Sequence, residues 1–433
     1  YTQEEFARKV GIKKSNLSRI ESGKENISFS FLMKMISAYT YSVNLRHEFP
    51  DPNCDVYVLK QYDFELLSFK LVEQEIESEY KAEIISVNEE LKHLLPITLE
   101  LTNDSLTKFL KRRAIPKNRT YVEKILESQG LTTNDFKGIL DVCMGLSLND
   151  SYWVTKLNFR GKFEDYNLYE NDFSTALAVL AYAGGDSSPI EITTSPEFTT
   201  GGMLPKAWRK LHNEIYLFKG STTGFANAGN EAYAEYYASQ ILDAMGLNHV
   251  EYELIKWKNI IGCKCKLFTD INTSYVPIGR IVETGGLSPC LEYFKSLSNE
   301  DYEYIKSILT FDCLVFNEDR HFGNFGVLVD NETNKVLKAA PIFDNGNSLF
   351  HYAMRKDFED IYKYSKTRTN PYGISFDDLA KYSIGKIQTE QLKKLINFKF
   401  KRHEQFNWPE WRLTKLEDFI SNRALCLIKR YGK

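Results

Sequence analysis

The stretch Asn317-Glu-Asp-Arg-His-Phe-Gly-Asn324, followed by Phe343-Asp-Asn-Gly346, decides how this sequence is interpreted. Asp319 lies five residues before Asn324, and Asp344 lies twenty residues after it. Either segment alone would be interpreted as a solvated turn, because Asp, Asn and Gly are turn formers. Together, in this order and spacing, they predict a phosphoryl-transfer site. One carboxylate contacts a hydroxyl there, and an amide oxygen and a second carboxylate hold Mg²⁺.

The catalytic loop of protein kinases spaces its Asp and Asn in the same way and is followed by a metal-binding Asp. The sequence therefore predicts an ATP-dependent kinase with Asp319 as catalytic residue and Asn324 and Asp344 as Mg²⁺ ligands. Residues 325–329 and 336–342 are apolar and flank a polar turn, which predicts a β-hairpin. Such a hairpin would return Asp344 toward Asn324, as a shared cation requires.

Length and composition limit the class of protein. At roughly 150 residues per domain, a chain of 433 residues predicts two to four domains. Apolar residues make up 43% of the chain, enough for sizeable cores, and a net charge of −3 gives no overall basic field for nucleic acid. No stretch approaches the roughly 18 apolar residues of a membrane span, and no signal peptide is visible.

The seven cysteines are scattered apart from Cys263 and Cys265. No Cys or His group has zinc spacing, so Cys263 and Cys265 are expected to share one face of a strand. Unpaired, scattered cysteines are typical of a reducing compartment, and we expect a cytoplasmic protein.

The N-terminal residues 1–47 carry eight Lys or Arg against four Glu, a local charge of +4. Phe6, Ala7 and Val10 form one apolar helical face, and Gly11 permits a tight turn. Leu17 and Ile20 would form the inner face of a second short helix. Two short helices around a glycine turn predict a helix-turn-helix unit, with a generic helical hairpin as the alternative.

The second helix of this unit would present polar and basic side chains to a DNA groove and its phosphates: Lys13, Lys14, Ser15, Asn16, Ser18 and Arg19. The segment from Gln3 to Gly23 resembles the Xre-type, or Cro/C1-type, repressor domain. Such domains usually begin with one more helix before the Thr-Gln pair, and we expect that first helix to be missing from this chain. The resemblance implies operator DNA as a partner and a homodimer.

Residues 195–206 read Ser-Pro-Glu-Phe-Thr-Thr-Gly-Gly-Met-Leu-Pro-Lys. Gly201 and Gly202 would let backbone N–H groups approach an anion, so this segment predicts a loop over the phosphates of a nucleotide. A plain turn is the alternative, because a Gly-Gly pair alone is a weak signal.

Residues 215–219 predict a strand that ends in Lys219, where kinases place a lysine against the α and β phosphates. A helix is expected from Glu231, and either Glu231 or Glu235 would pair with Lys219. Solvated charges are the alternative for all three residues. Upstream, strands are expected at 56–59 and 66–72, and the charged residues 74–93 predict a helix.

The motifs occur in the order found in the HipA family of bacterial serine/threonine kinases, which are toxins of toxin–antitoxin systems: Thr-Thr-Gly-Gly-Met-Leu-Pro-Lys206, Leu-Phe-Lys219, Asn-Glu231, Asn-Glu-Asp-Arg-His321, Asn324 and Phe-Asp344. This resemblance covers roughly residues 55–430. It implies ATP and Mg²⁺ as cofactors, Lys219, Gly201, Gly202 and Glu231 at the nucleotide, Asp319 as the catalytic base, and Asn324 and Asp344 at the metal.

The same resemblance implies a multidomain chain, in which an all-α helix-turn-helix domain precedes an α+β kinase-like fold with a mixed N-lobe and a helical C-lobe. The expected domains are residues 1–48, 55–268 and 269–433. The family autophosphorylates a serine in its glycine-rich loop, and alignment through Gly202 and Lys206 puts Thr199 at that position. Here the chain departs from the family serine, so Thr200 and Ser195 remain alternative acceptors.

The family antitoxin is normally a separate Xre-type protein, whereas here such a domain precedes the kinase-like part, like a fused HipB-type antitoxin. The resemblance implies a kinase that binds its own operator, is nucleoid-associated when bound to DNA, and has a protein substrate. The family's substrates include an aminoacyl-tRNA synthetase, and a separate antitoxin is a further family partner. Two alternatives remain: a transcriptional regulator with a nucleotide-sensing pseudokinase body, and a small-molecule or lipid kinase.

Overall fold

The computed structural model describes residues 56–74, 80–185, 195–224 and 226–432. The chain divides into two compact units. One unit combines Tyr1–Tyr57 with Lys156–Gly161, and the other comprises Val58–Thr155 and Lys162–Lys433. The predicted helix-turn-helix at residues 1–48 lies outside the described residues, so the fold below is essentially that of the second unit.

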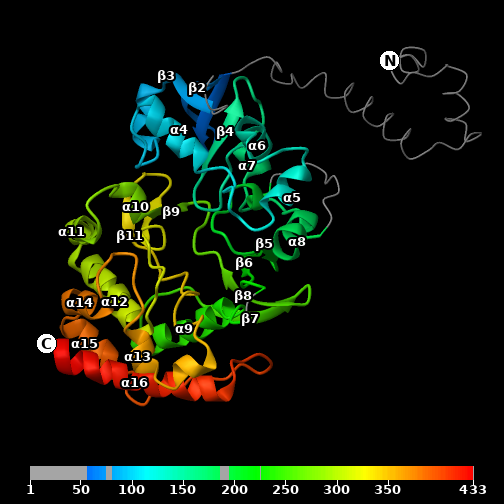
Figure 1. Cartoon of the computed structure of the whole chain (residues 1–433). Helices are drawn as coiled ribbons and strands as arrows, with labels where there is room; N and C mark the ends of the chain where they lie inside the picture. Colours follow the sequence, from blue (N-terminus) through cyan, green and yellow to red (C-terminus); the bar gives the residue numbers. More distant parts are fainter. Residues whose placement is uncertain (1–55, 75–79, 186–194, 225, 433) are drawn as a thin grey trace, which may run out of the picture. The chain divides into compact units, whose positions relative to one another are not determined.

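An antiparallel sheet opens the described part of the chain (Figure 1). Its strand order is β3-β2-β1-β4, with β1 (Val56–Gln61), β2 (Phe64–Glu73), β3 (Tyr80–Val87) and β4 (Tyr152–Lys156). β1 and β2 confirm the strands expected near residues 56–59 and 66–72. The helix expected at 74–93 is wrong, because residues 80–87 form the edge strand β3 and only Glu89–Leu94 form a short 3₁₀ helix.

Several short helices belong to the same part of the chain. Helix α4 (Asn103–Lys111) packs on β3, and its N-cap Thr102 accepts a hydrogen bond from the N–H of Ser105. Further along are α5 (Val122–Glu127), α6 (Phe136–Cys143), α7 (Phe163–Tyr166), α8 (Thr175–Ala183) and the 3₁₀ helix η3 (Pro196–Phe198). A buried cluster that includes Ile125, Leu126, Leu177 and Phe198 joins α5, α8 and η3.

A second antiparallel sheet, in the order β5-β6-β8-β7, carries Lys219. Its strands are β5 (Lys206–Leu211), β6 (Glu214–Lys219), β7 (Tyr252–Trp257) and β8 (Ile260–Lys266). Helix α9 (Glu231–Met245) packs on β7 and β8, and α8 packs on β5. The sequence correctly predicted that Lys219 ends a strand and that a helix begins at Glu231. Cys263 and Cys265 lie two residues apart on β8, both buried among apolar side chains.

A third sheet, in the order β11-β10-β9, contains the hairpin between the two predicted metal ligands. β10 (Gly326–Asp330) pairs antiparallel with β11 (Val336–Ala339) and with β9 (Thr273–Pro277). The expected hairpin is therefore confirmed. It begins two residues after Asn324 and ends five residues before Asp344, so the chain returns to its starting edge.

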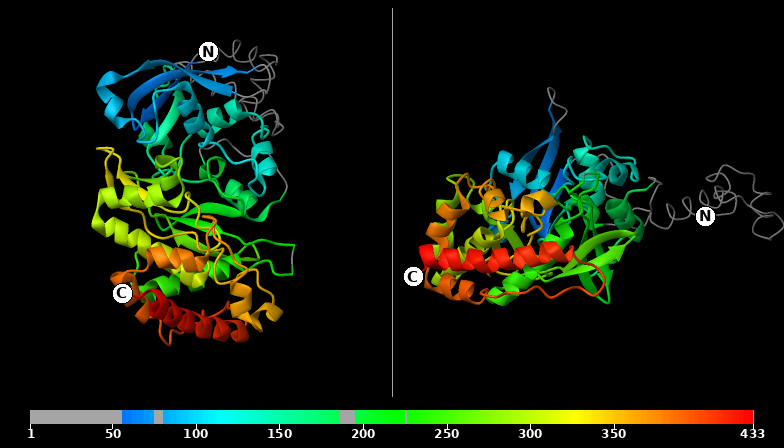
Figure 2. Two further views of the ribbon diagram at one scale, coloured as in Figure 1. Left: turned by 60° about the vertical axis from the view of Figure 1, so that its left-hand side comes forward. Right: turned by 60° about the horizontal axis from the view of Figure 1, so that its bottom comes forward.

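The C-terminal part of the chain is helical and holds the largest buried core. Its helices are α10 (Ile278–Ile281), α11 (Leu287–Leu297), α12 (Asn299–Val315), η4 (Arg355–Phe358), α13 (Ile361–Ser365), α14 (Phe376–Ser383), α15 (Lys386–Lys393) and α16 (Glu410–Tyr431). Helix α12 packs against α11, α14, α15 and α16, and Figure 2 shows α16 alongside the orange helices α14 and α15. Antiparallel sheets followed by helices form the α+β body that the sequence predicted.

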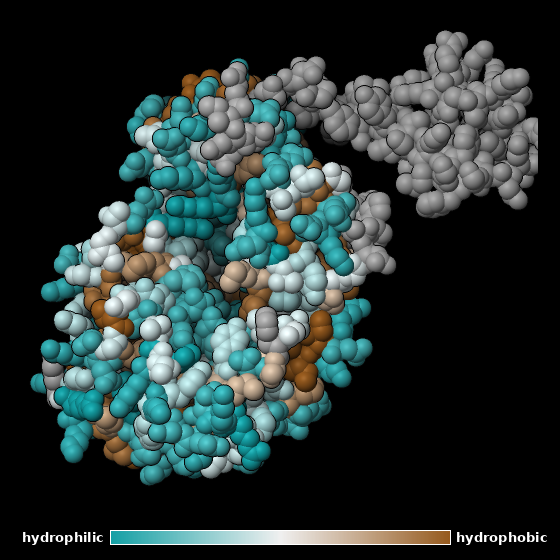
Figure 3. Space-filling model, in the orientation of Figure 1, coloured by the Kyte–Doolittle hydropathy of each residue, from teal (hydrophilic) through white to brown (hydrophobic). Residues whose placement is uncertain are grey.

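Figure 3 shows hydrophilic residues over most of one face, with hydrophobic residues in separate patches. Among the residues searched, no helix combines the length and the apolar character needed to span a membrane.

Candidate functional site

The loop that carries Asp319 starts at the C-terminal end of α12. Phe316 ends the helix in the left-handed conformation (φ 54°), and its N–H donates to the carbonyl of Asp312. Asn317 is fully buried, its side-chain Nδ2 donates to Asp312 Oδ1 (3.1 Å), and its Oδ1 accepts from the N–H of Asp319 (3.1 Å). The loop is therefore anchored to the helix before it reaches Asp319.

Asn324 and Asn347 hold Asp319 from two sides. Asn324 Nδ2 donates to the Asp319 carbonyl (2.9 Å), and Asn347 Nδ2 donates to Asp319 Oδ2 (3.0 Å). Burial raises the pKa of the Asp319 carboxyl above its ordinary value, and the Asp344 carboxylate adds to this, whereas His321 acts in the opposite direction. A carboxylate with a raised pKa is a better proton acceptor near neutral pH.

The guanidinium of Arg320 ties the Asp319 loop to the Asp344 segment. Arg320 is fully buried, and its Nε donates to Asp312 Oδ2 (3.1 Å). Its Nη1 donates to the carbonyls of Asn324 (3.1 Å) and Phe343 (2.6 Å), and its Nη2 donates to Asn345 Oδ1. The planar guanidinium of Arg320 thus bonds to residues on both sides of the hairpin. It holds Asn324 close to the segment that carries Asp344.

Lys219 lies between two carboxylates. Its Nζ donates to Glu235 Oε1 on α9 and to Asp344 Oδ1 (2.5 Å). Glu235 Oε2 accepts from the backbone N–H of Asn345 (2.7 Å), so α9 is bonded to both β6 and the Asp344 segment. The structure therefore brings Lys219, Asp344, Asp319 and Asn324 together in one site.

The charges of this site stabilise one another. Burial would lower the pKa of Lys219, but the Asp344 and Glu235 carboxylates outweigh it and hold the pKa well above its usual range. Burial would raise the pKa of Asp344, but Lys219 and Lys206 hold it well below its usual range. Burial lowers the pKa of Lys206 to about 8. The site keeps an anionic Asp344 and a cationic Lys219 at neutral pH.

Glu231 does not pair with Lys219, which corrects one of the two expectations for that lysine. Glu231 is buried and accepts instead from Thr222 Oγ1 (2.6 Å) and from the hydroxyl of Tyr352 (3.4 Å). Glu235, four residues and about one turn further along α9, is the partner of Lys219.

Residues 119 and 120 hold the glycine-containing loop at several points. The buried Arg119 donates to the Glu197 carboxylate and carbonyl (both 2.6 Å) and to the carbonyl of Lys206 (2.9 Å). Thr120 donates from its N–H (2.9 Å) and its hydroxyl (2.7 Å) to the carbonyl of Met203.

Gly201 and Gly202 lie between these attachments on the exposed part of the loop. Gly202 has a φ of 84°, and a Cβ there would lie 2.2 Å from Lys206 Nζ. A side chain at this position would therefore push aside a lysine whose charge acts on Asp344. The placement fits a loop that covers an anion bound beside Lys219.

The three loop hydroxyls differ in their surroundings. Ser195 is only 3% exposed. The Thr200 hydroxyl donates to the carbonyl of Pro196 (2.6 Å) and accepts from Trp208 Nε1 (2.9 Å). Thr199 is partly buried, and its hydroxyl makes a long hydrogen bond to the same carbonyl (3.4 Å). The Ser195 hydroxyl is buried and makes no hydrogen bond among the described residues, so Thr199 alone combines partial exposure with only a weak hydrogen bond.

The donor set fits a hard cation such as Mg²⁺. The Asp344 carboxylate is anionic and its side chain is 40% exposed. Asn324 donates through Nδ2, while its Oδ1 accepts no hydrogen bond from the described residues. No group of three or more His, Cys, Asp or Glu in the described ranges could hold a metal by itself. One carboxylate and one amide oxygen suit Mg²⁺, which keeps several waters and is also bound by phosphates.

Several residues of the site were not expected from the sequence: Asp312, Arg320, Asn345, Asn347, Tyr252 and Arg119. Arg320 and Asn345 directly follow Asp319 and Asp344 in the two motifs, and Asp312 and Asn347 lie within seven residues of them. Tyr252 and Arg119 are contributed by segments far away in the chain, which spacing along the sequence does not reveal.

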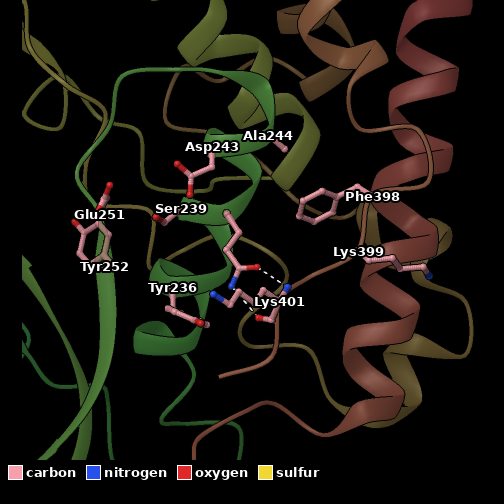
Figure 4. Close-up of a pocket in the computed structure, with 10 residues that line it drawn as sticks. Tyr236, Ser239, Asp243, Ala244, Glu251, Tyr252, Phe398, Lys399 and Lys401 are labelled. Atoms are coloured by element: carbon pink, nitrogen blue, oxygen red, sulfur yellow. Dashed lines mark hydrogen bonds between the residues drawn. The ribbon is translucent and has the colours of Figure 1, made fainter. Parts of the chain in front are cut away.

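A pocket of about 520 Å³ lies beside α9, β7 and residues 398–401 (Figure 4). It is lined by Tyr236, Ser239 and Gln240 of α9, Tyr252 of β7, and residues 398, 399 and 401. None of the residues predicted to bind nucleotide or metal lines it. Tyr252 belongs to both places, because its hydroxyl accepts a hydrogen bond from the N–H of Asp344 (3.1 Å).

Comparison with known proteins gives a match for the N-terminal part of the chain. The family model described as helix-turn-helix matches residues 1–45. This confirms the helix-turn-helix expected from Gly11, Leu17 and Ile20.

Similarity to kinases covers other parts of the chain. The serine/threonine-protein kinase CtkA of Helicobacter pylori (strain J99) is 30% identical over 160 residues, 33% of this chain and 49% of CtkA. The chain thus spans about half the length of that relative (49%). The crystal structure of a Helicobacter pylori proinflammatory kinase CtkA matches 52% of this chain and 91% of that chain, with 20% identity and a TM-score of 0.39.

A second solved structure is the Shewanella oneidensis MR-1 toxin–antitoxin complex of HipA, HipB and operator DNA. It matches 87% of this chain and 99% of that chain, with 10% identity and a TM-score of 0.49. The helix-turn-helix match at residues 1–45 and the partial similarity to a serine/threonine kinase agree with the resemblance expected from the motifs.

Proposed function

We propose that this chain is an ATP- and Mg²⁺-dependent serine/threonine protein kinase. The observation that carries the proposal is the shared position of Lys219 between Glu235 and Asp344, beside the loop of Asp319 and Asn324. Phosphoryl transfer requires a cation for the phosphates, metal ligands and a group at the hydroxyl, and these residues supply each of them. The partial similarity to CtkA supports the same activity.

In the proposed reaction each residue has one task. Lys219, oriented by Glu235, binds phosphate oxygens, and the loop at Gly201 and Gly202 covers them. Asp319 receives the proton of the acceptor hydroxyl. Asn324 and Asp344 hold Mg²⁺, which when bound neutralises phosphate charge. Arg320 keeps the loop and the Asp344 segment in register.

Incubation with labelled ATP tests this proposal against its alternatives. A protein kinase transfers label to protein, whereas a small-molecule or lipid kinase labels only those acceptors. A nucleotide-sensing pseudokinase binds ATP and transfers nothing. Transfer at the wild-type rate in Asp319→Asn protein would exclude the assigned site, and an inactive wild-type chain that binds Mg·ATP would favour the sensing alternative.

The Asp344→Asn substitution is expected to weaken Mg·ATP binding by at least about tenfold, because it removes one negative charge from a hard-cation ligand. Nucleotide binding without Mg²⁺ should change little. Titration calorimetry with and without Mg²⁺ measures both affinities. Unchanged Mg·ATP affinity together with full activity would exclude Asp344 as a metal ligand.

We propose that the N-terminal domain binds operator DNA as a dimer, with half-sites about one helical turn apart. The match to the helix-turn-helix family at residues 1–45 and the charge of +4 over residues 1–47 support this. The proposed boundaries are residues 1–48 for this domain, 55–268 for an N-lobe and 269–433 for a C-lobe.

Lys14→Ala and Arg19→Ala are each expected to lower operator affinity. For each lost phosphate contact, the slope of log binding constant against log salt concentration should become shallower by about one unit. Mobility-shift assays at several salt concentrations measure both. The control is Lys393→Ala, an exposed lysine on α15. Kinase activity should stay unchanged in all three variants, and equal binding of own-promoter and random DNA would exclude a specific operator.

Phosphorylation of the loop is a proposed means of control, with Thr199 favoured because it is partly exposed and weakly hydrogen-bonded, whereas Ser195 is buried and Thr200 makes two shorter bonds. A phosphate adds about −1.5 to −2 charges. It would compete with ATP phosphates for Lys219 and lower activity. Mass spectrometry after incubation with ATP should find phosphate on residues 195–200 in wild-type but not in Asp319→Ala protein. Unmodified wild-type protein would remove the autoregulation and leave the kinase assignment standing.

The biological setting belongs to the same proposal. A kinase fused to a helix-turn-helix fits a toxin–antitoxin system in which the chain represses its own operator. Its protein substrate would be a hydroxyl-bearing protein such as an aminoacyl-tRNA synthetase. In that setting, Asp319→Ala should relieve growth inhibition by the expressed chain.

A further inference from the structure

The backbone of Asp344 has an uncommon conformation. Its φ is 59°, in the left-handed region that residues with a side chain rarely adopt. Such a residue persists where neighbouring groups hold it in place. The structure has to supply contacts that fix this segment.

Two successive backbone N–H groups of the segment are held by side chains. The N–H of Asp344 donates to the hydroxyl of Tyr252 (3.1 Å), and the N–H of Asn345 donates to Glu235 Oε2 (2.7 Å). These contacts involve the backbone alone. The Asp344 carboxylate, which is bonded to Lys219, takes no part in holding its own backbone in place.

Tyr252 also belongs to the sheet that carries Lys219. It lies on β7 and pairs with Cys265 of β8, and β8 pairs with β6 at Lys219 and Cys263. Tyr252 is 6% exposed, and its ring centroid lies 5.5 Å from Lys219 Nζ, which is within cation–π distance. One buried side chain thus contacts the phosphate-binding lysine with its ring and Asp344 with its hydroxyl.

We infer that Tyr252 is a positioning residue for the proposed phosphoryl transfer. Its hydroxyl holds the Asp344 backbone in the left-handed conformation, so that the carboxylate can leave Lys219 and serve as a ligand of a divalent cation. This inference rests on the proposed function. Figure 4 labels Tyr252 on β7 beside α9, where it also borders the pocket on that helix.

The Tyr252→Phe substitution tests the inference, because it removes the hydroxyl and keeps the ring over Lys219. Its matched control is Tyr237→Phe on α9, which removes another buried hydroxyl bond, to Asn407 Oδ1 (2.6 Å), outside the site. Calorimetry with Mg·ATP, calorimetry with ATP in EDTA, and thermal unfolding of the ligand-free protein are measured for both variants.

Tyr252→Phe is expected to bind Mg·ATP about tenfold more weakly than wild type. A tenfold change is about the upper limit for the net loss of one hydrogen bond. Binding of ATP in EDTA and the unfolding temperature should match those of Tyr237→Phe. Wild-type Mg·ATP affinity in Tyr252→Phe would overturn the inference, as would an equal loss of affinity with and without Mg²⁺. If the wild-type chain itself does not bind Mg·ATP, the proposed function fails. Calorimetry on wild-type protein therefore separates a failure of the proposed function from a failure of the role of Tyr252.

Discussion

Replacing Asp319 by asparagine is expected to reduce phosphoryl transfer about 10³-fold, within the range for loss of a general base. Asparagine can still accept the hydrogen bond from Asn347 Nδ2, so the loop should keep its conformation. It cannot take up the proton of the acceptor hydroxyl. The affinity for Mg·ATP should stay within about threefold of wild type, because Asp319 acts at the acceptor and not at the nucleotide.

Asp330→Asn is the matched control, since Asp330 lies at the end of β10 and bonds to Thr333 away from the site. It removes one carboxylate from the hairpin that follows the Asp319 loop and should leave transfer unchanged. Transfer at the wild-type rate in Asp319→Asn protein would show that another group accepts the proton. Loss of transfer together with loss of nucleotide binding would point to a collapsed loop.

Removing the Arg320 side chain is expected to produce the largest loss of stability, about 3–5 kcal/mol in the free energy of unfolding. The Arg320 and Asp312 side chains are both 1% exposed, so Arg320→Ala leaves a buried carboxylate without its cation. It also leaves the carbonyls of Asn324 and Phe343 without their donor. Denaturant unfolding measures the effect, and Mg·ATP affinity should fall with it.

Two variants make this result interpretable. Arg430→Ala removes an exposed arginine from its pair with Asp377 and should leave the unfolding midpoint at the wild-type value. The double variant Asp312→Leu with Arg320→Leu removes both charges and should be more stable than Arg320→Ala. An Arg320→Ala protein that unfolds at the wild-type denaturant concentration would contradict the proposed role of this residue.

Local patterns predicted most elements that position the site: the strand ending in Lys219, the helix from Glu231 and the hairpin after Asn324. They failed at residues 74–93, where many charged residues suggested a helix. β3 is an edge strand with only Ala82 fully buried, so its charged residues point to solvent without an apolar alternation. Charged edge strands resist pairing with other chains, and their composition resembles that of an exposed helix.

The choice between Glu231 and Glu235 illustrates a second limit. Both are acidic, lie on α9 and are buried, so periodicity along the helix could not separate them. The packing of α9 against β7 and β8 turns Glu235 toward Lys219. Glu231 instead accepts hydrogen bonds from the hydroxyls of Thr222 and Tyr352. The three loop hydroxyls illustrate the same limit. The sequence offers them as equivalent candidates, and only burial and hydrogen bonding in the structure distinguish them.

By itself, the sequence determined the identities and order of the chemical groups: Asp319, Asn324, Asp344 and Lys219, together with the helix-turn-helix signature. Residue type and short spacing encode these features directly. The tertiary structure alone decided how the groups meet, through Arg320 between two loops, Glu235 at Lys219 and Tyr252 at the Asp344 backbone. Contacts of the site join segments up to 125 residues apart, as between Lys219 and Asp344, and only the packing of sheets against helices brings them within hydrogen-bonding distance.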